Sequence, residues 1–379
     1  MEVATRAFDR LAEKKGDLLE ATFSEIPEFK DAPLAKARQY LRLAALLHDV
    51  GHAAFSHAAE KVVHKDMGHE KLSVQVITRT DLLGGDIEAL FLPEASGWVA
   101  YLIEGARELY PQLEVLHDIV SGEMDADRTD YLIRDSHHCG VDYGRFDYRR
   151  LIESQDVHIG DDGQLQVALS EDGRHALEAL ILARYQMNTQ VYYHRVRRIF
   201  DLYLLRYHKA LADEHAWTPD DILRNNDVTL TKQLFDDAET GEGDRHKWAE
   251  RIIERRHHRE VFQTQVDADA FDIRNAKQIM QELGNQFDGV EFLFDHAESS
   301  IHKQLRDGDR SEIGLNALCL MDSRGHPRYA GYASQILSTI PREFQCARIF
   351  ADVDPLDEAK RFQMMTSADN MWQQRRTRR

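Results

Sequence analysis

The sequence has little cysteine and no long apolar run. Its three cysteines are widely spaced and form neither a zinc-binding pattern nor a disulfide framework. The best apolar run, residues 41–47, is interrupted by Arg42 and ends at His48, well short of the roughly 18 residues that a membrane helix needs. The N-terminal segment is charged and amphipathic, unlike a signal peptide. We therefore expect a cytoplasmic protein.

Positive charge is also scarce. Lysine and arginine number 48 against 66 aspartate and glutamate residues, which gives a net charge of -18. An acidic surface repels phosphate backbones, so binding to nucleic acid is disfavoured, although a local basic pocket can still hold a small phosphorylated ligand. With 379 residues, 42% hydrophobic and 30% charged, the composition is that of a soluble globular enzyme of two or three domains.

Hydrophobic periodicity predicts a largely helical chain. Apolar residues at helical spacing indicate helices at 34–47 and 125–136, and one long helix or a pair of helices at 174–213. Two β-prone runs around an Asp-Asp-Gly turn predict a hairpin at 156–169. Two further strands are expected near the C-terminus, at 313–321 and 347–353.

These elements predict a mainly α fold with a small hairpin and a C-terminal α+β subdomain. We expect a core that carries the functional site at 1–155, followed by a hairpin and long helices at 156–218. A charged helical accessory region is expected at 219–310, and a small α+β subdomain with a basic tail at 311–379. The basic run inside the accessory region is more typical of a solvated face than of a binding site.

The segment 43–60, LAALLHDVGHAAFSHAAE, places histidines and acids directly after an apolar helix. It contains His48, Asp49, His52, His57 and Glu60. Imidazole and carboxylate together form a mixed N/O ligand set that suits Mn²⁺, Fe²⁺, Zn²⁺ or Mg²⁺. Glu60 follows His57 by three residues and is placed to orient its ring. A histidine-rich surface helix explains this clustering less well.

Two later segments carry polar stripes at helical spacing. Asp127, Tyr131 and Asp135 lie at i, i+4 and i+8, which indicates either a solvent-facing stripe or the lining of a cavity. Arg184 and Tyr192 show the same eight-residue spacing, and more cations follow them. Cations beside aromatic residues in an acidic protein favour a phosphate site, but a salt-bridged surface helix fits this spacing equally well.

Together, these three segments resemble the HD-domain metal phosphohydrolases, in particular the branch of deoxynucleoside triphosphate triphosphohydrolases. The similarity is carried by LLHDVGHAAFSH, by MDADRTDYLIRDSHHCGVDYGRFD and by ARYQMNTQVYYH, and it covers roughly residues 1–200. It implies a helical bundle with a divalent metal site.

The resemblance implies a role for twelve residues. The implied metal ligands are His48, Asp49 and Asp127. Catalytic roles, which include orienting phosphate and protonating the leaving oxygen, are implied for His52, His57, His69 and Glu60. Phosphate contacts are implied for Arg128 and Arg184, and sugar contacts for Tyr131, Asp135 and Tyr192.

One ligand of the family pattern is missing. The family's first metal-binding histidine lies on a helix before the His-Asp motif, and no histidine precedes His48 here. We expect that the chain begins at an internal methionine, after that histidine. If the site truly lacks this ligand, metal affinity and activity should be weaker.

The resemblance implies hydrolysis of a dNTP at the α-phosphorus, giving a deoxynucleoside and tripolyphosphate. It also implies a homo-oligomer (a dimer, tetramer or hexamer) that a nucleotide activates. Two alternatives stay open. One is a phosphodiesterase or 3′-exonuclease acting on single-stranded nucleic acid or cyclic nucleotides, and the other is a non-catalytic nucleotide sensor or assembly partner.

Overall fold

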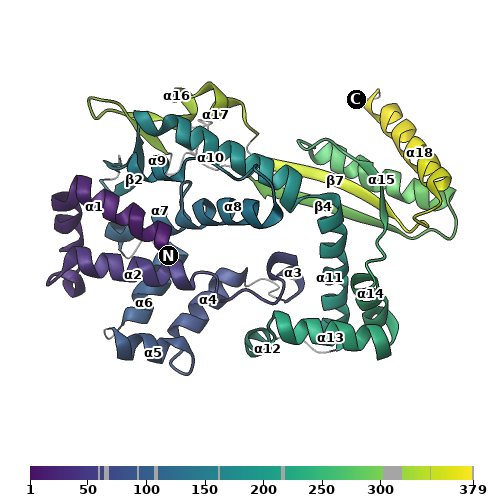
Figure 1. The fold of residues 1–379 in the computed structure, drawn as a ribbon, viewed down its shortest axis with the longest axis horizontal. Helices are drawn as coiled ribbons and strands as arrows, with labels where there is room; N and C mark the ends of the chain where they lie inside the picture. Colours follow the sequence, from purple (N-terminus) through teal and green to yellow (C-terminus); the bar gives the residue numbers. More distant parts are fainter. Residues whose placement is uncertain are drawn as a thin grey trace. The chain divides into compact units, whose positions relative to one another are not determined.

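The chain forms two compact units, each assembled from segments that are distant in the sequence. The computed structural model describes residues 1–58, 60–63, 68–91, 94–105, 110–160, 163–214, 218–301, 318–341 and 343–377 (Figure 1). The first unit contains Met1–His52, Met67–Met187 and His302–Ile340, and the second contains Ala53–Asp66, Asn188–Ile301 and Pro341–Arg379. None of the helices in the described ranges is both long and apolar enough to cross a bilayer.

The first unit is mainly helical. Its α-helices are α1 (Glu2–Phe23), α2 (Pro33–Leu47), α4 (Gly68–Thr78), α5 (Leu83–Leu90), α6 (Ala95–Glu104), α7 (Glu114–Ser121), α8 (Ala126–Cys139), α9 (Tyr148–Glu153), α10 (Arg174–Met187), α16 (Ala330–Ala333) and α17 (Gln335–Thr339). On α1, Ala4, Phe8 and Leu11 recur at helical spacing and are buried in the main core. Helix α2 begins with Pro33, whose fixed φ suits the first helical position, and buries Leu41 in the same core.

A four-stranded sheet completes the first unit. Strand β1 (Gln155–Ile159) pairs antiparallel with β2 (Leu165–Ser170), with Val157 opposite Val167. Strand β2 continues in parallel with β5 (Cys319–Met321), which in turn pairs with β6 (Pro327–Tyr329), so the order is β1-β2-β5-β6. Val157 is buried in the helical core, so the hairpin seals one side of it.

The second unit combines helices with a three-stranded antiparallel sheet. Its helices are α3 (Glu60–Val63), α11 (Arg195–Glu214), α12 (Pro219–Arg224), α13 (Asp227–Thr240), α14 (Gly243–Ile253), α15 (Ala270–Gln286) and α18 (Glu358–Arg376). The strands are β3 (Arg259–Gln263), β4 (Phe292–Ser300) and β7 (Glu343–Ala351), in the order β3-β7-β4.

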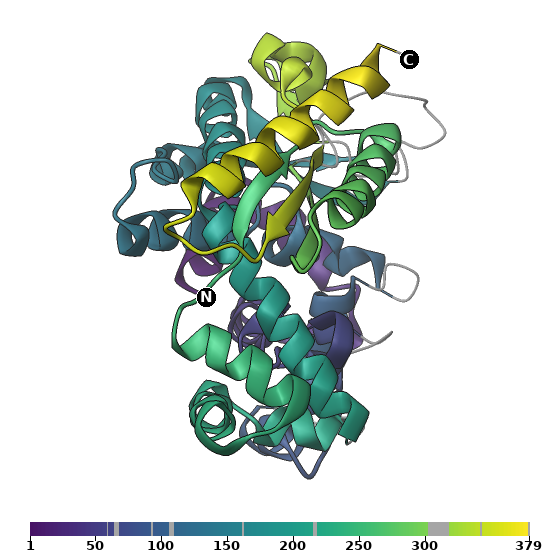
Figure 2. The ribbon, with the colours of Figure 1, turned by 90° about the vertical axis from the view of Figure 1, so that its right-hand side faces the viewer.

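Alternation along β7 separates the two faces of this sheet. Ala347, Ile349 and Ala351 pack into a core with α15 and α18, which cover one face (Figure 2). Phe350 points the other way and packs in a second core with residues of α11 and α14, including Tyr203 and Trp248.

The structure confirms the predicted fold class: a mainly α chain with a C-terminal α+β region. The helices predicted at 34–47 and 125–136 and the hairpin at 156–169 are present. The stretch 174–213 is a pair of helices, α10 and α11, separated by a π-helical turn at Asn188–Tyr192.

Two expectations for the C-terminal half need correction. The region 219–310 is not wholly helical, because β3 and β4 lie within it; their charged residues hide the strand alternation. The segment 311–379 is not one subdomain, because β5 and β6 belong to the first unit and β7 and α18 to the second. Of the strand predicted at 313–321, the structure has Cys319–Met321, and residues 313–317 lie outside the described residues.

Candidate metal centre

Three predicted ligands meet where α2 ends and α8 begins. His48 is the C-cap residue of α2, and its backbone N–H donates to the carbonyl of Ala44. Asp49 follows in the turn after the helix, and Asp127 lies in the first turn of α8. The structure thus brings together residues from two separate sequence motifs of the first unit.

The donor atoms of these residues are close but do not satisfy one another. Nε2 of His48 lies 3.4 Å from Oδ1 of Asp49 and 3.6 Å from Oδ1 of Asp127, too far for a good hydrogen bond. Neither ring nitrogen of His48 has a hydrogen-bond partner within the described part of the chain, although both are buried. All three ligand atoms lie within 4.8 Å of one another. This spacing fits donors that surround one cation at about 2.0–2.2 Å each.

The electrostatics of the centre also favour a cation. Burial alone would lower the pKa of His48, but the carboxylates of Asp127 and Asp49 outweigh burial and raise it. Burial alone would raise the pKa of Asp127, but His48 and then Arg128 hold it below its usual value. Two carboxylates facing one imidazole therefore form an acidic pocket that a proton or a divalent ion can neutralise.

Gly51 allows the turn that follows His48 to pack closely against α4. Its backbone N–H donates to the Ser73 hydroxyl at 2.8 Å, and a Cβ at this position would overlap the backbone of Ser73 and of His69. Only glycine fits this approach, so Gly51 ties the loop that carries His48 and Asp49 to α4.

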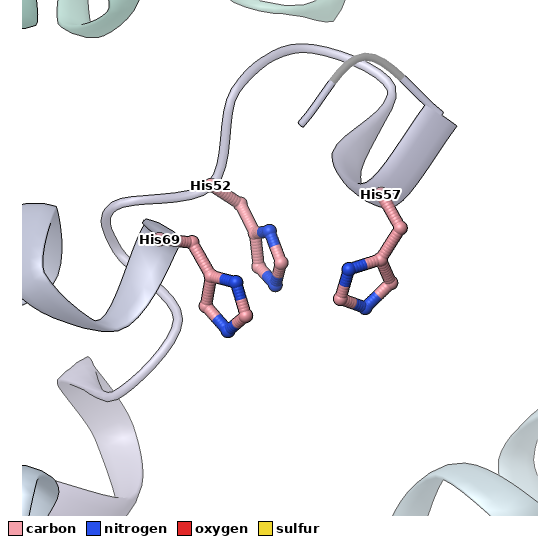
Figure 3. Close-up of side chains that lie close together, drawn as sticks. All are labelled: His52, His57 and His69. Atoms are coloured by element: carbon pink, nitrogen blue, oxygen red, sulfur yellow. The ribbon is translucent and has the colours of Figure 1, made fainter. Parts of the chain in front are cut away.

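Two of the predicted pocket histidines stack beside this turn. The rings of His52 and His69 lie nearly parallel, at 18° with centroids 3.9 Å apart (Figure 3). His52 also points its Nε2 toward Oδ1 of Asp49, 3.6 Å away. The pair is therefore linked to the metal centre through Asp49, although the two residues come from a loop and from the first turn of α4.

The other two residues of the catalytic prediction belong to the second unit. His57 lies on the short 3₁₀ helix Ser56–Ala58, and its Nδ1 is 2.8 Å from Oε2 of Glu60 at the start of α3. This is the contact that the three-residue spacing predicts. The catalytic role of either residue stays a prediction.

Two arginines of the first unit, the half-buried Arg128 and the buried Arg184, lie near the start of α8. The first, Arg128, follows Asp127 on α8 and contacts Oδ2 of Asp125 at 3.0 Å. The second, Arg184 on α10, is buried and lies 3.7 Å from Oε1 of Glu123. Burial and the positive charge of Arg128 lower the pKa of Arg184.

Asp125 and Glu123 are the residues that sequence reasoning missed. Asp125 is the N-cap of α8 and accepts a hydrogen bond from the backbone N–H of Arg128. Burial raises its pKa to about 6, although Arg128 opposes that shift. An Asp directly before the first residue of a helix is a capping signal, and it could have identified Asp125. Nothing in the sequence marked Glu123.

The three residues predicted to contact the sugar lie on α8 and in the π-helical turn after α10. Tyr131 and Asp135 are half-buried on the face of α8 that also carries Asp127, as the i, i+4, i+8 spacing predicts. Burial raises the pKa of the Tyr131 hydroxyl, and the cationic Arg184 opposes this. Tyr192 ends the π-helical turn in the second unit, and its carbonyl accepts a hydrogen bond from Arg197.

Known proteins are similar to this chain in sequence and in fold. The uncharacterized protein YwfO of Bacillus subtilis is 35% identical over 201 residues, 52% of this chain and 42% of that protein. The deoxynucleoside triphosphate triphosphohydrolase SAMHD1 homolog of Dictyostelium discoideum is 30% identical over 173 residues, 42% of this chain and 31% of that protein. The matches thus span less than half the length of these curated relatives.

The crystal structure of a hypothetical protein from Aquifex aeolicus shares the fold. It superposes with a TM-score of 0.69 at 24% identity and covers 96% of this chain and 83% of the other. Family models match two consecutive regions, the HD domain at residues 9–135 and the HD associated region at residues 146–288. The candidate metal ligands His48, Asp49 and Asp127 all lie within the region that the HD domain model matches, and the region similar to the HD associated region follows it.

Proposed function

We propose that this chain hydrolyses deoxynucleoside triphosphates at the α-phosphorus and releases a deoxynucleoside and tripolyphosphate. The observation that carries this proposal is the position of two arginines at the start of α8: Arg128 follows Asp127 directly, and Arg184 of α10 lies 3.7 Å from Glu123, just before the helix. An acidic cation site beside two guanidinium groups is what a phosphate chain complexed with a divalent ion requires. The similarity to a relative named as a triphosphohydrolase supports the choice of substrate.

In this proposal, three residues bind the cation and two bind the phosphates. His48, Asp49 and Asp127 would hold a divalent cation, which lowers the pKa of water and withdraws charge from phosphate oxygens. Arg128 and Arg184 would bind the phosphate oxygens and stabilise the negative charge that grows on them as the reaction proceeds.

In the reaction, the oxygen of a water molecule bonds to the α-phosphorus while the bond from that phosphorus to the 5′-oxygen breaks. A proton must reach the departing 5′-oxygen. One of the stacked pair His52 and His69 supplies it in this proposal, because the pair lies beside Asp49 and because histidine in general titrates near neutral pH. Tyr131 and Asp135, on the same face of α8 as Asp127, would contact a deoxyribose and leave no room for a 2′-hydroxyl.

The test is product analysis with matched variants. The purified chain is incubated with each dNTP and each NTP in Mn²⁺ or Mg²⁺, and the products are separated by ion-exchange chromatography. We expect deoxynucleoside plus tripolyphosphate from dNTPs, and a loss of at least about 100-fold in Asp127→Asn. Asp130→Asn is the control, because Asp130 is exposed on the same helix and pairs with Arg134.

Release of dNMP or dNDP would place the cut elsewhere and refute the proposed reaction. Cleavage of oligonucleotides or cyclic nucleotides in preference to dNTPs would favour a phosphodiesterase. Full activity in Asp127→Asn would remove the metal centre from the mechanism.

A further inference from the structure

The second unit contains a small pocket whose walls are rich in arginine. The pocket has a volume of about 80 Å³ and lies where the start of α11, the edge strand β3 and the first turn of α18 meet. Its cationic side chains are Arg195, Arg259 and Arg361, and Phe350 contributes an apolar wall. These residues belong to neither motif of the metal centre.

The arginines of this pocket are poorly neutralised. Arg361 donates from Nε and Nη2 to the backbone carbonyl of Glu260, both at 3.3 Å, and Nη1 of Arg259 lies 3.3 Å from Nε2 of His257. In the part of the chain that the structure describes, neither guanidinium has a carboxylate within 4.0 Å. Arg195 reaches the carboxylate of Glu260 only at 4.0 Å.

Among the described residues that line the pocket, Glu260 is the one carboxylate. It also contacts Arg348, which lies outside the pocket. Its Oε2 lies 3.3 Å from Nε of Arg348, on the neighbouring strand β7. Burial raises the pKa of the Glu260 carboxyl, and Arg348 and then Arg195 oppose this. Arg348 also lies 3.7 Å from the carboxylate of Asp295. One carboxylate among the three arginines that line the pocket leaves a local excess of positive charge in a chain whose net charge is -18.

The start of α11 adds to this positive potential. Arg195 and Val196, its first two residues, line the pocket, so the positive end of a 20-residue helix faces the same space as the guanidinium groups. Helix N-termini favour anions, and arginine forks bind phosphate oxygens in pairs. Two separate features thus select the same kind of ligand.

The volume limits what this ligand can be. Pockets that enclose whole small-molecule ligands measure about 300–1,000 Å³, so a pocket of about 80 Å³ has room for a phosphoryl group but not by itself for a nucleoside. A second pocket of about 490 Å³ shares Val196 and His257 with it, so a larger group attached to the phosphoryl has space outside the small pocket. We propose that it is a binding site for a single phosphoryl group, either inorganic phosphate or the end of a polyphosphate chain. The site is independent of the metal centre, because it uses none of the same residues.

The proposal is tested by titration calorimetry of the 379-residue chain with inorganic phosphate, in EDTA and at fixed ionic strength. We expect saturable binding at one site per chain. Loss of one arginine fork in Arg259→Gln or Arg361→Gln should weaken it by about tenfold or more. Arg256→Gln is the matched control, because Arg256 pairs with Glu250 and Glu254 outside the pocket. The affinity of the Arg256→Gln variant for phosphate should stay within about twofold of the wild-type value.

Circular dichroism and thermal melting establish that each variant is folded, and the two pocket variants provide independent evidence. Arg259→Lys keeps the charge but not the fork, so it should recover only part of the affinity. Absence of saturable binding to the wild type would overturn the proposal. So would equal weakening in Arg256→Gln, because the effect would then be one of net charge.

Further titrations identify the source of the phosphoryl group. Tripolyphosphate and a dNTP are compared with inorganic phosphate under the same conditions. Similar affinities for tripolyphosphate and the dNTP, both sensitive to Arg259→Gln, would show that the end of a polyphosphate chain enters the pocket. Binding of phosphate alone would identify free phosphate as the ligand. A dNTP that binds over about tenfold more tightly than tripolyphosphate, with the excess lost in Arg259→Gln, would overturn the restriction to a phosphoryl group.

Discussion

Nε2 of His48 lies 3.6 Å from Oδ1 of Asp127, although the two residues come from different helices and different motifs. At this separation each residue favours the charged form of the other, because Asp127 raises the pKa of His48 and His48 lowers the pKa of Asp127, without a strong hydrogen bond between them. A separation of this size is typical of two ligands of one cation. It can be tested by replacing either residue.

Loss of the ligand atom of His48 or of Asp127 should strongly weaken binding of the cation. His48→Ala and Asp127→Asn each delete one of three converging donors, so we expect Mn²⁺ affinity to fall by about 100-fold or more. Calorimetric titration of the metal-free chain measures this. Asp130→Asn should bind Mn²⁺ as the wild type does, and equal losses in all three variants would contradict the assigned ligand set.

Metal affinity should depend steeply on pH. The pKa of His48 is raised in the metal-free chain, and a ligand histidine must be neutral, so protons compete with the metal below that raised pKa. As the pH is lowered, the metal affinity should therefore start to decrease while the pH is still above 6.5, the ordinary pKa of histidine. At lower pH it should decrease about tenfold per pH unit. Mn²⁺ titrations at pH 8, 7 and 6 measure the slope. A flat profile would exclude His48 as a ligand.

Gly51→Ala should disturb the loop of the metal centre. The new Cβ would overlap the backbone of Ser73 and His69, so α4 must shift, at an expected cost of about 1–3 kcal/mol. Urea denaturation gives the free energy of unfolding, and Mn²⁺ titration reports the effect on the site. Gly97→Ala is the control, because its Cβ on α6 would meet nothing within 4 Å, and it should stabilise by up to about 1 kcal/mol.

Asp125→Ala should be far more destabilising than loss of an ordinary helix cap. It removes the cap of α8 and leaves the mostly buried Arg128 without its 3.0 Å partner, which together should cost about 3–5 kcal/mol. Asp147→Ala removes the cap of α9 at an exposed position and should cost about 1 kcal/mol. Urea denaturation of both variants measures the difference, and equal losses would show that the pairing with Arg128 contributes nothing.

Two buried histidines should make stability fall in mild acid. Burial lowers the pKa of His208 and of His258 to about 4. Their folded-state pKa values lie below the unfolded value of about 6.5, so the stabilisation is complete above pH 6.5 and is lost progressively as the pH falls toward 4. Each residue should cost about 2 kcal/mol of stability between pH 7.5 and pH 5.

Urea denaturation at these two pH values is the measurement. In His208→Gln, the difference between the free energies of unfolding at pH 7.5 and pH 5 should be smaller by about 2 kcal/mol than in the wild type. His138→Gln, which removes an exposed histidine, should leave the difference as it is in the wild type. An unchanged difference in His208→Gln would exclude that residue as a source of the acid sensitivity.

The sequence by itself determined the helices and the composition of the metal centre. Pro33 and the apolar spacing define α2, the turn around Gly163 defines the hairpin, and the position of His48 after an apolar run marks the His-Asp motif. These signals are local: helix and turn preferences act over a few residues, so a linear sequence displays them directly.

The tertiary structure alone decided which distant residues meet. It brings Asp127 to His48 and sets Arg184 beside Glu123. It also inserts β3 and β4 into a region whose charge suggested only helices, because strand pairing with β7 outweighs local preference. Such contacts depend on how helices and strands pack across long stretches of chain, and periodicity in the sequence carries no record of that packing.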